Sequence, residues 1–334
     1  MKGKKKKYLI LGSNSFSGAS YIDFILSKDV EIIGISRQIE TNSVMLPYKD
    51  NAYIKNFKFI KLNINREIDK LIEIVNNFKP EYIINYVAQG EVRNSWKFPE
   101  QWYQTNCLSL VSFTNKLVDK KFLKKFISVS TPEVYGTTPN NYKESNSYNP
   151  STPYAASKLA ADLHLNTLYK KYNFPVIYSR SANIYGPHQQ LYRIIPRTII
   201  YLKKNKKIDL HGLGKSKRSF IHINDLSNAI FLLIKKGKIG EAYHVAPKGN
   251  LISIKDVVKL ICNKMQFDFK LNTNIISENY GQDSTYFLNT AKIRNKTGWK
   301  EKISLSDGIE QTIEWIDQNW DKINKMPDQY IHRK

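Results

Sequence analysis

Tyr154 and Lys158 have the residue types and the spacing of a general base with a neighbouring cation. They stand four residues apart, so on a helix they share one face. An ammonium beside a phenol favours the phenolate, and it moves an ordinary pKa of about 10 toward neutrality. A phenolate near neutral pH takes a proton from a hydroxyl group. The pair is typical of acid–base chemistry on an alcohol. The alternative is a chance pair in a chain rich in Tyr and Lys, and the neighbouring segments decide between the two.

Thr131 and Glu133 form a second polar group, directly after the apolar segment 126–129. If this segment is a strand, both side chains lie at its carboxyl end, where a buried carboxylate serves as a base. We expect Thr131 to bond the substrate oxygen that Tyr154 deprotonates. The alternative is a helix-capping threonine followed by a solvated glutamate. The order of strand, carboxylate and Tyr–Lys pair favours catalysis.

Residues 12–18, GSNSFSG, follow the first apolar segment and precede an amphipathic one. Their pattern is G-x-x-S-x-x-G, with Ser15 in place of a middle glycine. Such a turn brings backbone amides at a helix N-terminus close to a pyrophosphate. The alternative is an ordinary Ser/Gly turn between a strand and a helix. The cofactor contacts predicted here are Gly12, Asn14, Ser15, Phe16, Ser17 and Gly18.

Ser36 and Arg37 directly follow the second apolar segment, 31–35. A carboxylate at this place would bond the ribose hydroxyls of NAD and repel an added phosphate. The first carboxylate comes only at Glu40, whereas a hydroxyl and a guanidinium suit a phosphate. We therefore predict NADP as the cofactor, contacted by Ser36 and Arg37. NAD held without an acidic clamp is the alternative.

Short apolar segments alternate with longer amphipathic ones through the first half of the chain. This alternation predicts an α/β fold with a Rossmann-type, doubly wound parallel sheet, whose ligands bind beyond the carboxyl ends of the strands. The predicted strands are 8–11, 31–35, 57–62, 81–87, 125–129 and 175–179, and the predicted helices are 16–27, 67–78, 100–118 and 154–172.

Shorter elements with several Pro and Gly residues follow residue 181, and they predict a smaller C-terminal substrate-binding domain. We expect residues 1–180 to form the NAD(P)-binding Rossmann domain. The chain is expected to return to that domain near 218–246, with the return to the main sheet near 220–234. The substrate-binding domain then comprises residues 181–217 and 247–334, and a final amphipathic helix is expected at 305–318.

The composition is that of a globular protein of 334 residues with a formal net charge of +23. Most of the 52 basic residues are Lys scattered over the chain, so we expect no specific nucleic-acid partner. No apolar run is long enough to span a bilayer, so no membrane partner is expected. Cys107 and Cys262 cannot form a disulfide framework, and free thiols favour a cytoplasmic location.

Six segments of the sequence together resemble the extended short-chain dehydrogenase/reductase family of nucleotide-sugar enzymes. They are GSNSFSG, NYVAQ, STPEVYG, YAASK, NIYG and RSFIH, in this order, and the resemblance covers nearly the whole chain. Segment 130–136 is similar to the sugar nucleotide 4,6-dehydratases and UDP-glucuronate decarboxylases. The family's 4-epimerases usually lack a carboxylate at the Glu133 position.

The resemblance implies a nucleotide-sugar 4,6-dehydratase. Tyr154, assisted by Lys158 and Thr131, takes the proton of the 4-hydroxyl while hydride leaves carbon 4. Glu133 then removes the carbon 5 proton as water leaves carbon 6, and hydride returns to carbon 6. The product is a 4-keto-6-deoxy sugar.

The resemblance also implies binding residues and a homodimer. The further cofactor contacts are Asn63, Ile64, Val87, Ala88, Gln89 and Ser181, beside Tyr154 and Lys158. The implied substrate contacts are Asn183, Arg193, His211 and Arg218. Two arginines suit a diphosphate; the alternative places Arg193 and Arg197 on a solvated helix face. The implied partner is a nucleotide-diphosphate sugar, and no metal is expected.

Two residues depart from the family pattern. Pro132 stands where dTDP-glucose dehydratases carry an Asp that protonates the leaving hydroxyl, and Asn279 stands where an Arg is usual. A 4-epimerase and a UDP-glucuronate decarboxylase on the same fold are therefore the enzymatic alternatives. A non-catalytic NADP-binding protein or a nucleic-acid-binding protein is the alternative from another class.

Overall fold

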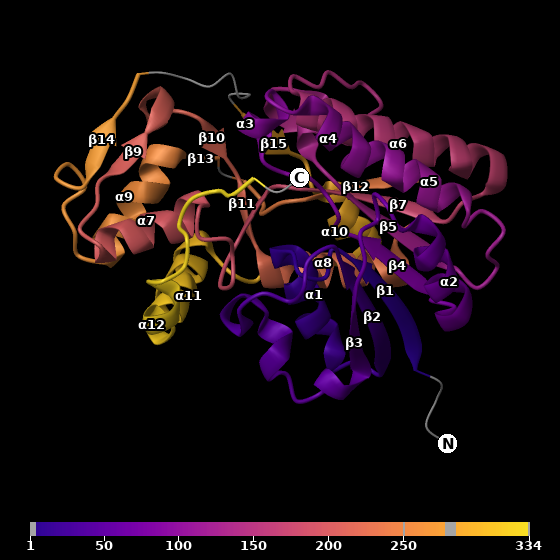
Figure 1. The fold of residues 1–334 in the computed structure, drawn as a ribbon. Coiled ribbons are helices and arrows are strands. Elements are labelled where there is room, and N and C mark those ends of the chain that lie inside the picture. The colour runs from indigo at the N-terminus through magenta and orange to yellow at the C-terminus, as the bar shows by residue number, and fades with distance from the viewer. Residues whose placement is uncertain (1–4, 250, 278–284, 333–334) are drawn as a thin grey trace.

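A seven-stranded parallel sheet lies at the centre of the molecule, with helices on both faces (Figure 1). The computed structural model describes residues 5–249, 251–277 and 285–332. The strand order is β12-β7-β5-β4-β1-β2-β3, so it changes direction between β1 and β4. In such sheets this is the place where a crevice opens for ligands. The predicted Rossmann-type fold is confirmed.

The strands of this sheet agree closely with the predicted apolar segments. They are β1 Lys6–Leu11, β2 Val30–Ser36, β3 Phe57–Lys61, β4 Tyr82–Asn85, β5 Lys125–Ser130, β7 Val176–Ser181 and β12 Ala242–Val245. Successive side chains of β1 enter different layers: Tyr8 and Ile10 join one apolar core, and Leu9 and Leu11 join the other. This alternation is the geometry of a strand that is buried on both faces.

Two layers of helices cover the sheet. Helices α1 (Phe16–Leu26) and α8 (Ile223–Lys236) contribute to the core on one face. Helices α2 (Ile68–Phe78), α5 (Ser109–Asn115) and α6 (Pro153–Tyr172) contribute to the core on the other. Because α6 carries both Tyr154 and Lys158, its packing on the sheet fixes the position of the pair.

The predicted helix 100–118 is interrupted. Helix α4 (Pro99–Tyr103) passes into a π-helical turn, η4 (Gln104–Leu108), and only then into α5. Within the turn, the buried Asn106 uses both atoms of its amide group to bond the backbone of Gln89, at 2.8 and 3.1 Å. A π-helical turn adds a residue to the helix, and such turns often occur at functional sites.

The second lobe has an apolar core of its own, formed by helices α7 (Ile194–Lys203), α9 (Ile254–Lys264), α11 (Leu305–Gln318) and α12 (Trp320–Ile323). The predicted helix at 305–318 is present as α11. Four small strand pairs connect and extend the lobes. They are β8 Asn183–Tyr185 with β11 Phe220–His222, β9 Ile208–Leu210 with β14 Thr273–Ile275, β10 Lys217–Arg218 with β13 Ile252–Ser253, and β6 Thr138–Tyr142 with β15 Tyr286–Leu288.

The chain rejoins the central sheet later than the segment 220–234 suggests. Strand β11 pairs with β8 in a separate two-stranded sheet, α8 packs in the core layer, and β12 is the strand that pairs with β7. Helix α10 (Ala291–Thr297) and Trp299 also pack in the Rossmann core layer. The reason is apolar burial, since Ile293 and Trp299 are both fully buried there.

The remaining elements are short. They are η1 Ser43–Met45, η2 Pro47–Asp50, η3 Ile54–Asn56, α3 Val92–Ser95, η5 Pro132–Tyr135 and η6 His211–Gly214. None of the helices in the described part of the chain combines the length and the apolar composition that a membrane span requires.

Candidate active site

Two adjoining cavities open where the strands of the central sheet end. The larger has a volume of about 980 Å³, and the smaller has a volume of about 460 Å³. Among the residues that line both are Ser15, Ala88, Glu91, Arg193 and Tyr330. A long ligand can therefore extend from one cavity into the other.

Tyr154 and Lys158 both line the larger cavity from the first turns of α6. The helix begins there because the Thr152 side chain accepts the Ala155 amide and Pro153 occupies the first helical position. The Lys158 ammonium is buried and donates to the Val129 carbonyl at 2.8 Å. Two of its three hydrogens remain for other acceptors.

The pKa of the Tyr154 phenol is raised, not lowered. Burial is the largest cause, the Glu133 carboxylate adds to it, and a hydrogen bond with Thr131 opposes it. Burial likewise lowers the pKa of Lys158, while Asp162 raises it. The predicted shift of the phenol toward neutrality is therefore wrong for this structure, because desolvation of the phenolate and the charge of Glu133 outweigh the hydrogen bond with Thr131.

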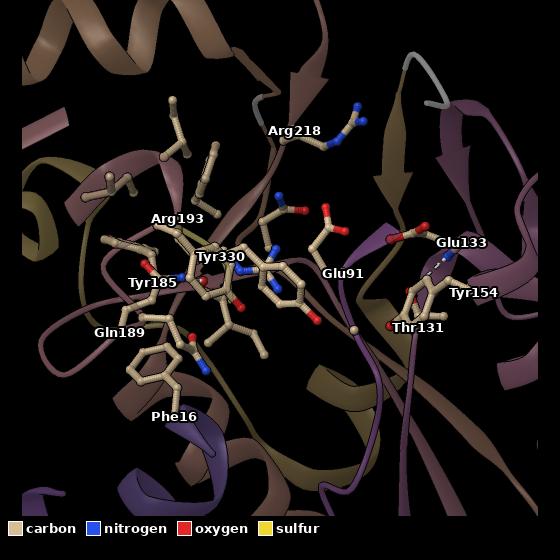
Figure 2. A pocket seen from close by; sticks show the side chains of 18 of the residues that line it. Phe16, Glu91, Thr131, Glu133, Tyr154, Tyr185, Gln189, Arg193, Arg218 and Tyr330 are labelled. Carbon is tan, nitrogen blue, oxygen red and sulfur yellow. Dashed lines mark hydrogen bonds between the residues drawn. The ribbon is translucent and has the colours of Figure 1, made fainter. Parts of the chain in front are cut away.

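Thr131, Glu133 and Tyr154 gather on one side of the larger cavity (Figure 2). Strand β5 ends at Ser130, and the Thr131 hydroxyl caps the short helix η5 by accepting the Glu133 amide at 3.3 Å. Pro132 occupies the first position of η5, where a fixed φ favours the turn. The capping role and the contact with Tyr154 are thus combined in one threonine.

The glycine turn has the geometry of an anion site. Ser15 caps α1 by accepting the Gly18 amide at 3.1 Å, and its own hydroxyl donates to the Gly12 carbonyl at 2.6 Å. A Cβ on Gly18 would lie 2.2 Å from that carbonyl, so Gly18 permits the close packing of helix and turn. Ser15, Phe16 and Ser17 line the larger cavity at the positive end of the helix dipole.

Ser36 and Arg37 line the smaller cavity, as expected for contacts to an adenosine ribose. The Ser36 hydroxyl accepts the Asn14 amide at 2.9 Å, which ties the end of β2 to the glycine turn. Glu40 is occupied elsewhere: it accepts from Tyr48 at 2.9 Å and from Lys49 at 2.7 Å. It is not among the residues that line the cavity.

Most of the other predicted site residues line the two cavities. The smaller cavity is lined by Gly12, Asn14, Asn63, Ile64, Val87, Ala88 and Gln89, and the larger by Ser181, Asn183, Arg193, His211 and Arg218. Gly18 is the exception among the predicted contacts, because it packs behind the turn. Asn279 lies outside the described residues.

The two arginines predicted to contact the substrate, Arg193 and Arg218, come from different elements, and Arg197 of α7 also lines the larger cavity. Arg193 directly precedes α7 and lies over the ring of Tyr192, 5.2 Å from its centroid. Arg218 is buried, and its guanidinium lies 4.8 Å from the centroid of the Tyr286 ring. Stacking on an aromatic face holds each guanidinium in place.

Three further residues support the site and were not predicted from the sequence. Besides bonding Gln89, Asn106 donates to the Ser157 hydroxyl at 3.0 Å, next to the helix turn that carries Lys158. Asp162 and Arg180 form a buried ion pair at 3.0 Å. Asp162 was detectable, since it follows Lys158 by four residues and therefore shares its helix face. Asn106 gave no such signal.

No group of three or more His, Cys, Asp or Glu side chains that could hold a metal is found within residues 5–249, 251–277 and 285–332.

The fold and the site define a Rossmann-type enzyme class with a Tyr–Lys pair facing a dinucleotide crevice. Residues 9–312 match the model of a protein family that is described as GDP-mannose 4,6 dehydratase. The chain belongs to this family, within the extended short-chain dehydrogenases/reductases, as its sequence motifs indicate.

Named relatives agree with this membership. A dTDP-D-glucose 4,6-dehydratase of Dictyostelium discoideum is 33% identical, over 79% of this chain and 70% of the relative. The dTDP-glucose 4,6-dehydratase of Bacillus anthracis, solved in complex with NAD, is 25% identical with a TM-score of 0.84, over 95% of this chain and 98% of that one. A UDP-glucose 4-epimerase of Thermotoga maritima, solved with UDP-glucose, shares the fold at 22% identity and a TM-score of 0.85, over 94% and 99% of the chains.

Proposed function

We propose that this enzyme dehydrates a nucleotide-diphosphate hexose to its 4-keto-6-deoxy derivative. The observation that carries the proposal is the position of Glu133, which lines the same cavity as the hydrogen-bonded pair of Thr131 and Tyr154. A carboxylate at that place supplies a second base, beyond the one that alcohol oxidation requires. The named dehydratase relatives support the same reaction.

The side chains of the site divide the steps of this reaction among them. Tyr154 takes the proton of the 4-hydroxyl, and the Thr131 hydroxyl holds the same oxygen. Glu133 takes the proton of carbon 5, which the new ketone has made acidic, while hydroxide leaves carbon 6 and departs as water. The nicotinamide dinucleotide, when bound, accepts the hydride of carbon 4 and gives it back to carbon 6. A proton added at carbon 5 completes the product.

With Pro132 in the place of an acid, the leaving hydroxyl needs its proton from Glu133 or from water. Glu133 holds a proton immediately after it has acted on carbon 5. Transfer of this proton to the departing hydroxyl would complete the elimination with one side chain. The turn η5 fixes Glu133 three residues beyond the end of β5, so the carboxyl group serves both steps from one place.

NADP is the cofactor that we infer. The glycine turn, the N-terminus of α1 and the two adjoining cavities together suit a dinucleotide. The edge of the smaller cavity offers Ser36 and Arg37, while Glu40, the first carboxylate after β2 in the sequence, bonds Tyr48 and Lys49 instead. A hydroxyl and a guanidinium together suit an added phosphate. NAD, present in the Bacillus anthracis relative, is the competing cofactor.

The substrate diphosphate is assigned to the larger cavity. Arg193 and Arg218 supply positive charge, and His211 and Asn183 supply further hydrogen-bonding groups. The dispersed positive charge of the chain would also attract a dianionic ligand. This interpretation leaves no role for a specific nucleic-acid partner.

We also propose a homodimer, formed through α6 and the helical segment before it. Leu108, Leu163 and Tyr103 lie on these elements and are 53%, 46% and 39% exposed. Exposed apolar side chains of this size on helices that contact one another favour burial against a second copy. Light scattering in solution tests this assignment.

We also propose a cytoplasmic location. The thiols of Cys107 and Cys262 are free, as is usual in a reducing compartment.

The reaction is tested by mass spectrometry on a panel of nucleotide sugars in heavy water. A dehydratase removes one water from its substrate, places one solvent deuteron at carbon 5 and moves the carbon 4 hydrogen to carbon 6. Inversion at carbon 4 without loss of water would instead identify a 4-epimerase. Loss of carbon dioxide from a uronic acid would identify a decarboxylase. Binding of NADP or NAD without any conversion would identify a non-catalytic protein.

A further inference from the structure

Residues 327–332, called the strap below, leave the second lobe after α12 and cross to the Rossmann lobe. Figure 1 shows this segment passing from the end of α12 toward the centre of the molecule, between the lobes. None of these residues belongs to a helix or strand. The sequence motifs of the site do not include them.

Each end of the strap is attached to a different lobe. On the second lobe, the Lys204 ammonium contacts the Asp328 carboxylate at 3.5 Å and the Asn324 carbonyl at 3.2 Å. On the Rossmann lobe, the His332 ring lies parallel to the rings of Phe98 and Trp102. Its centroid is 4.9 Å from that of Phe98 and 5.7 Å from that of Trp102.

His332 is also fixed by a hydrogen bond. Its Nε2 lies 2.9 Å from the Gln101 Oε1 atom, and an amide oxygen only accepts, so Nε2 donates. The second ring nitrogen, Nδ1, lies 3.5 Å from the Tyr330 hydroxyl. Stacking on two aromatic rings together with a directed hydrogen bond is specific anchoring, not loose contact of a chain end.

The strap forms part of the wall of both cavities. Gln329 and Tyr330 line the larger and the smaller cavity, while Pro327 and Ile331 line the smaller one. Tyr330 packs edge-on against Tyr192, with ring centroids 5.2 Å apart. Burial raises the pKa of Tyr330; among the nearby charges, that of Glu91 raises this pKa further and that of Arg193 lowers it. Figure 2 shows Tyr330 among the labelled side chains that line the cavity.

Ser15 also lines both cavities, at the N-terminus of α1. A dinucleotide that follows the glycine turn therefore has its diphosphate at the junction of the cavities, where Tyr330 lies. We propose that the strap retains the dinucleotide in the enzyme: Tyr330 contacts the bound cofactor, and the anchors at Asp328 and His332 must release before it leaves.

This inference rests on the proposed function in one respect. A dehydratase of this kind returns its hydride within each turnover, so its dinucleotide ends in the form in which it began. Such an enzyme has no need to exchange the cofactor, and a covering segment costs it no turnover. An enzyme with net oxidation would have to open the strap in every cycle.

The test measures release of a bound dinucleotide from the whole enzyme. Protein loaded with NADPH, and in a second arm with NADH, is mixed with an excess of the oxidised form, and the loss of bound-state fluorescence gives the dissociation rate. His332→Ala removes the anchor on the Rossmann lobe, and Asp328→Asn weakens the anchor on the second lobe. Tyr330→Ala removes the contact. Tyr172→Ala is the matched control, since Tyr172 is 47% exposed and lines neither cavity.

We expect His332→Ala and Tyr330→Ala to raise the dissociation rate about tenfold, Asp328→Asn less, and the control not at all. A rise below threefold in both His332→Ala and Tyr330→Ala overturns the proposal. An effect of Tyr330→Ala with none of His332→Ala also overturns it, because the contact would then act without a strap. Melting temperatures without dinucleotide verify that the variants are folded.

No sugar is present in this measurement, so the strap and the proposed reaction fail separately. Faster release in the variants of an enzyme that removes no water supports the strap and rejects the reaction. Normal removal of water with unchanged release rejects the strap alone. Failure of the wild-type protein to bind either dinucleotide overturns both.

Discussion

The Asp162 carboxylate lies 3.0 Å from the Arg180 guanidinium, and both side chains are almost completely buried. Ser130 donates to the same carboxylate oxygen at 2.6 Å, and Arg180 also bonds the Tyr135 hydroxyl. The ion pair therefore connects the end of β5, which precedes Thr131, with β7 and with helix α6, which carries Lys158.

Breaking this pair should be strongly destabilising. Asp162→Asn leaves a buried guanidinium without its countercharge, so we expect a loss of about 3–5 kcal/mol in the free energy of unfolding. Urea denaturation measures it. The combined replacement of Asp162 by Leu and Arg180 by Met should cost less than the two single changes added together. A loss below about 1 kcal/mol for Asp162→Asn would contradict the burial of the pair.

The pH dependence of the first oxidation should respond to Thr131. Its hydrogen bond lowers the pKa of Tyr154, so Thr131→Val should shift the rise of activity to higher pH by roughly one unit or less. The readout is the transient formation of reduced dinucleotide in a single turnover, followed as a function of pH. Thr131→Ser, which keeps the hydroxyl, should stay near wild type. An unchanged pH profile with Val would exclude the bond from the reacting state.

Glu133→Gln should separate oxidation from elimination. Tyr154 and Lys158 remain, so reduced dinucleotide and a 4-keto sugar that keeps its carbon 6 oxygen should accumulate. Loss of water should fall by at least about a hundredfold, the usual contribution of a positioned proton-transfer group. Absorbance of the reduced cofactor and mass spectrometry of the sugar follow the two steps. Undiminished loss of water in this variant would assign the second base to another residue.

Arg37→Ala should weaken NADP binding by about tenfold to a hundredfold, corresponding to about 1.5–3 kcal/mol for a charged hydrogen bond. NAD binding should hardly change, because its ribose carries no added phosphate. Equilibrium titration of both dinucleotides gives the two affinities. Equal losses for NADP and NAD, or wild-type binding of NAD alone, would show that Arg37 does not recognise the phosphate.

Two buried histidines should make the protein acid-sensitive. Burial lowers the pKa of His222 to about 4, and burial followed by the charge of Arg180 lowers that of His244 to about 3. The unfolded chain takes up these protons near pH 6.5, before the folded protein does. Their contribution to stability is therefore complete above pH 6.5 and is lost as the pH falls toward 4 and 3.

His222→Asn is the informative variant for this effect. His222 caps α8 through its Nδ1 atom, which accepts the Asn224 amide, and asparagine keeps an acceptor at that place without titrating. Between pH 7 and 4, the variant should lose about 3 kcal/mol less unfolding free energy than wild type. Urea denaturation at several pH values measures the difference. Parallel losses in both proteins would show that His222 does not control the acid response.

The sheet and the four central site residues were predictable because their signals are local. Buried parallel strands read as apolar runs, and the residues that follow each strand carry the polar groups. The pKa of Tyr154 was not predictable, because its direction depends on how completely the folded protein excludes water from the phenol. Sequence spacing gives the distance to Lys158 along the helix but not this desolvation.

The interruption of the helix 100–118 and the strap were missed for a related reason. Asn106 leaves the regular helix because Gln89 and Ser157 offer it partners from distant segments. His332 is held by Phe98, Gln101 and Trp102, which lie far from it in the sequence. Helix propensity describes neighbours in sequence, and neither contact is of that kind.

The π-helical turn at 104–108 also sets the rotational phase of everything that follows it in α5. Each residue of an α-helix turns the chain by about 100°. Deleting one residue from the turn would rotate α5 by that angle, moving Leu110 and Phe113 off the sheet and carrying solvent-facing residues into the core. The single added residue therefore lets Asn106 bond the backbone of Gln89 while, a turn later, Leu110 and Phe113 pack in the core on the sheet.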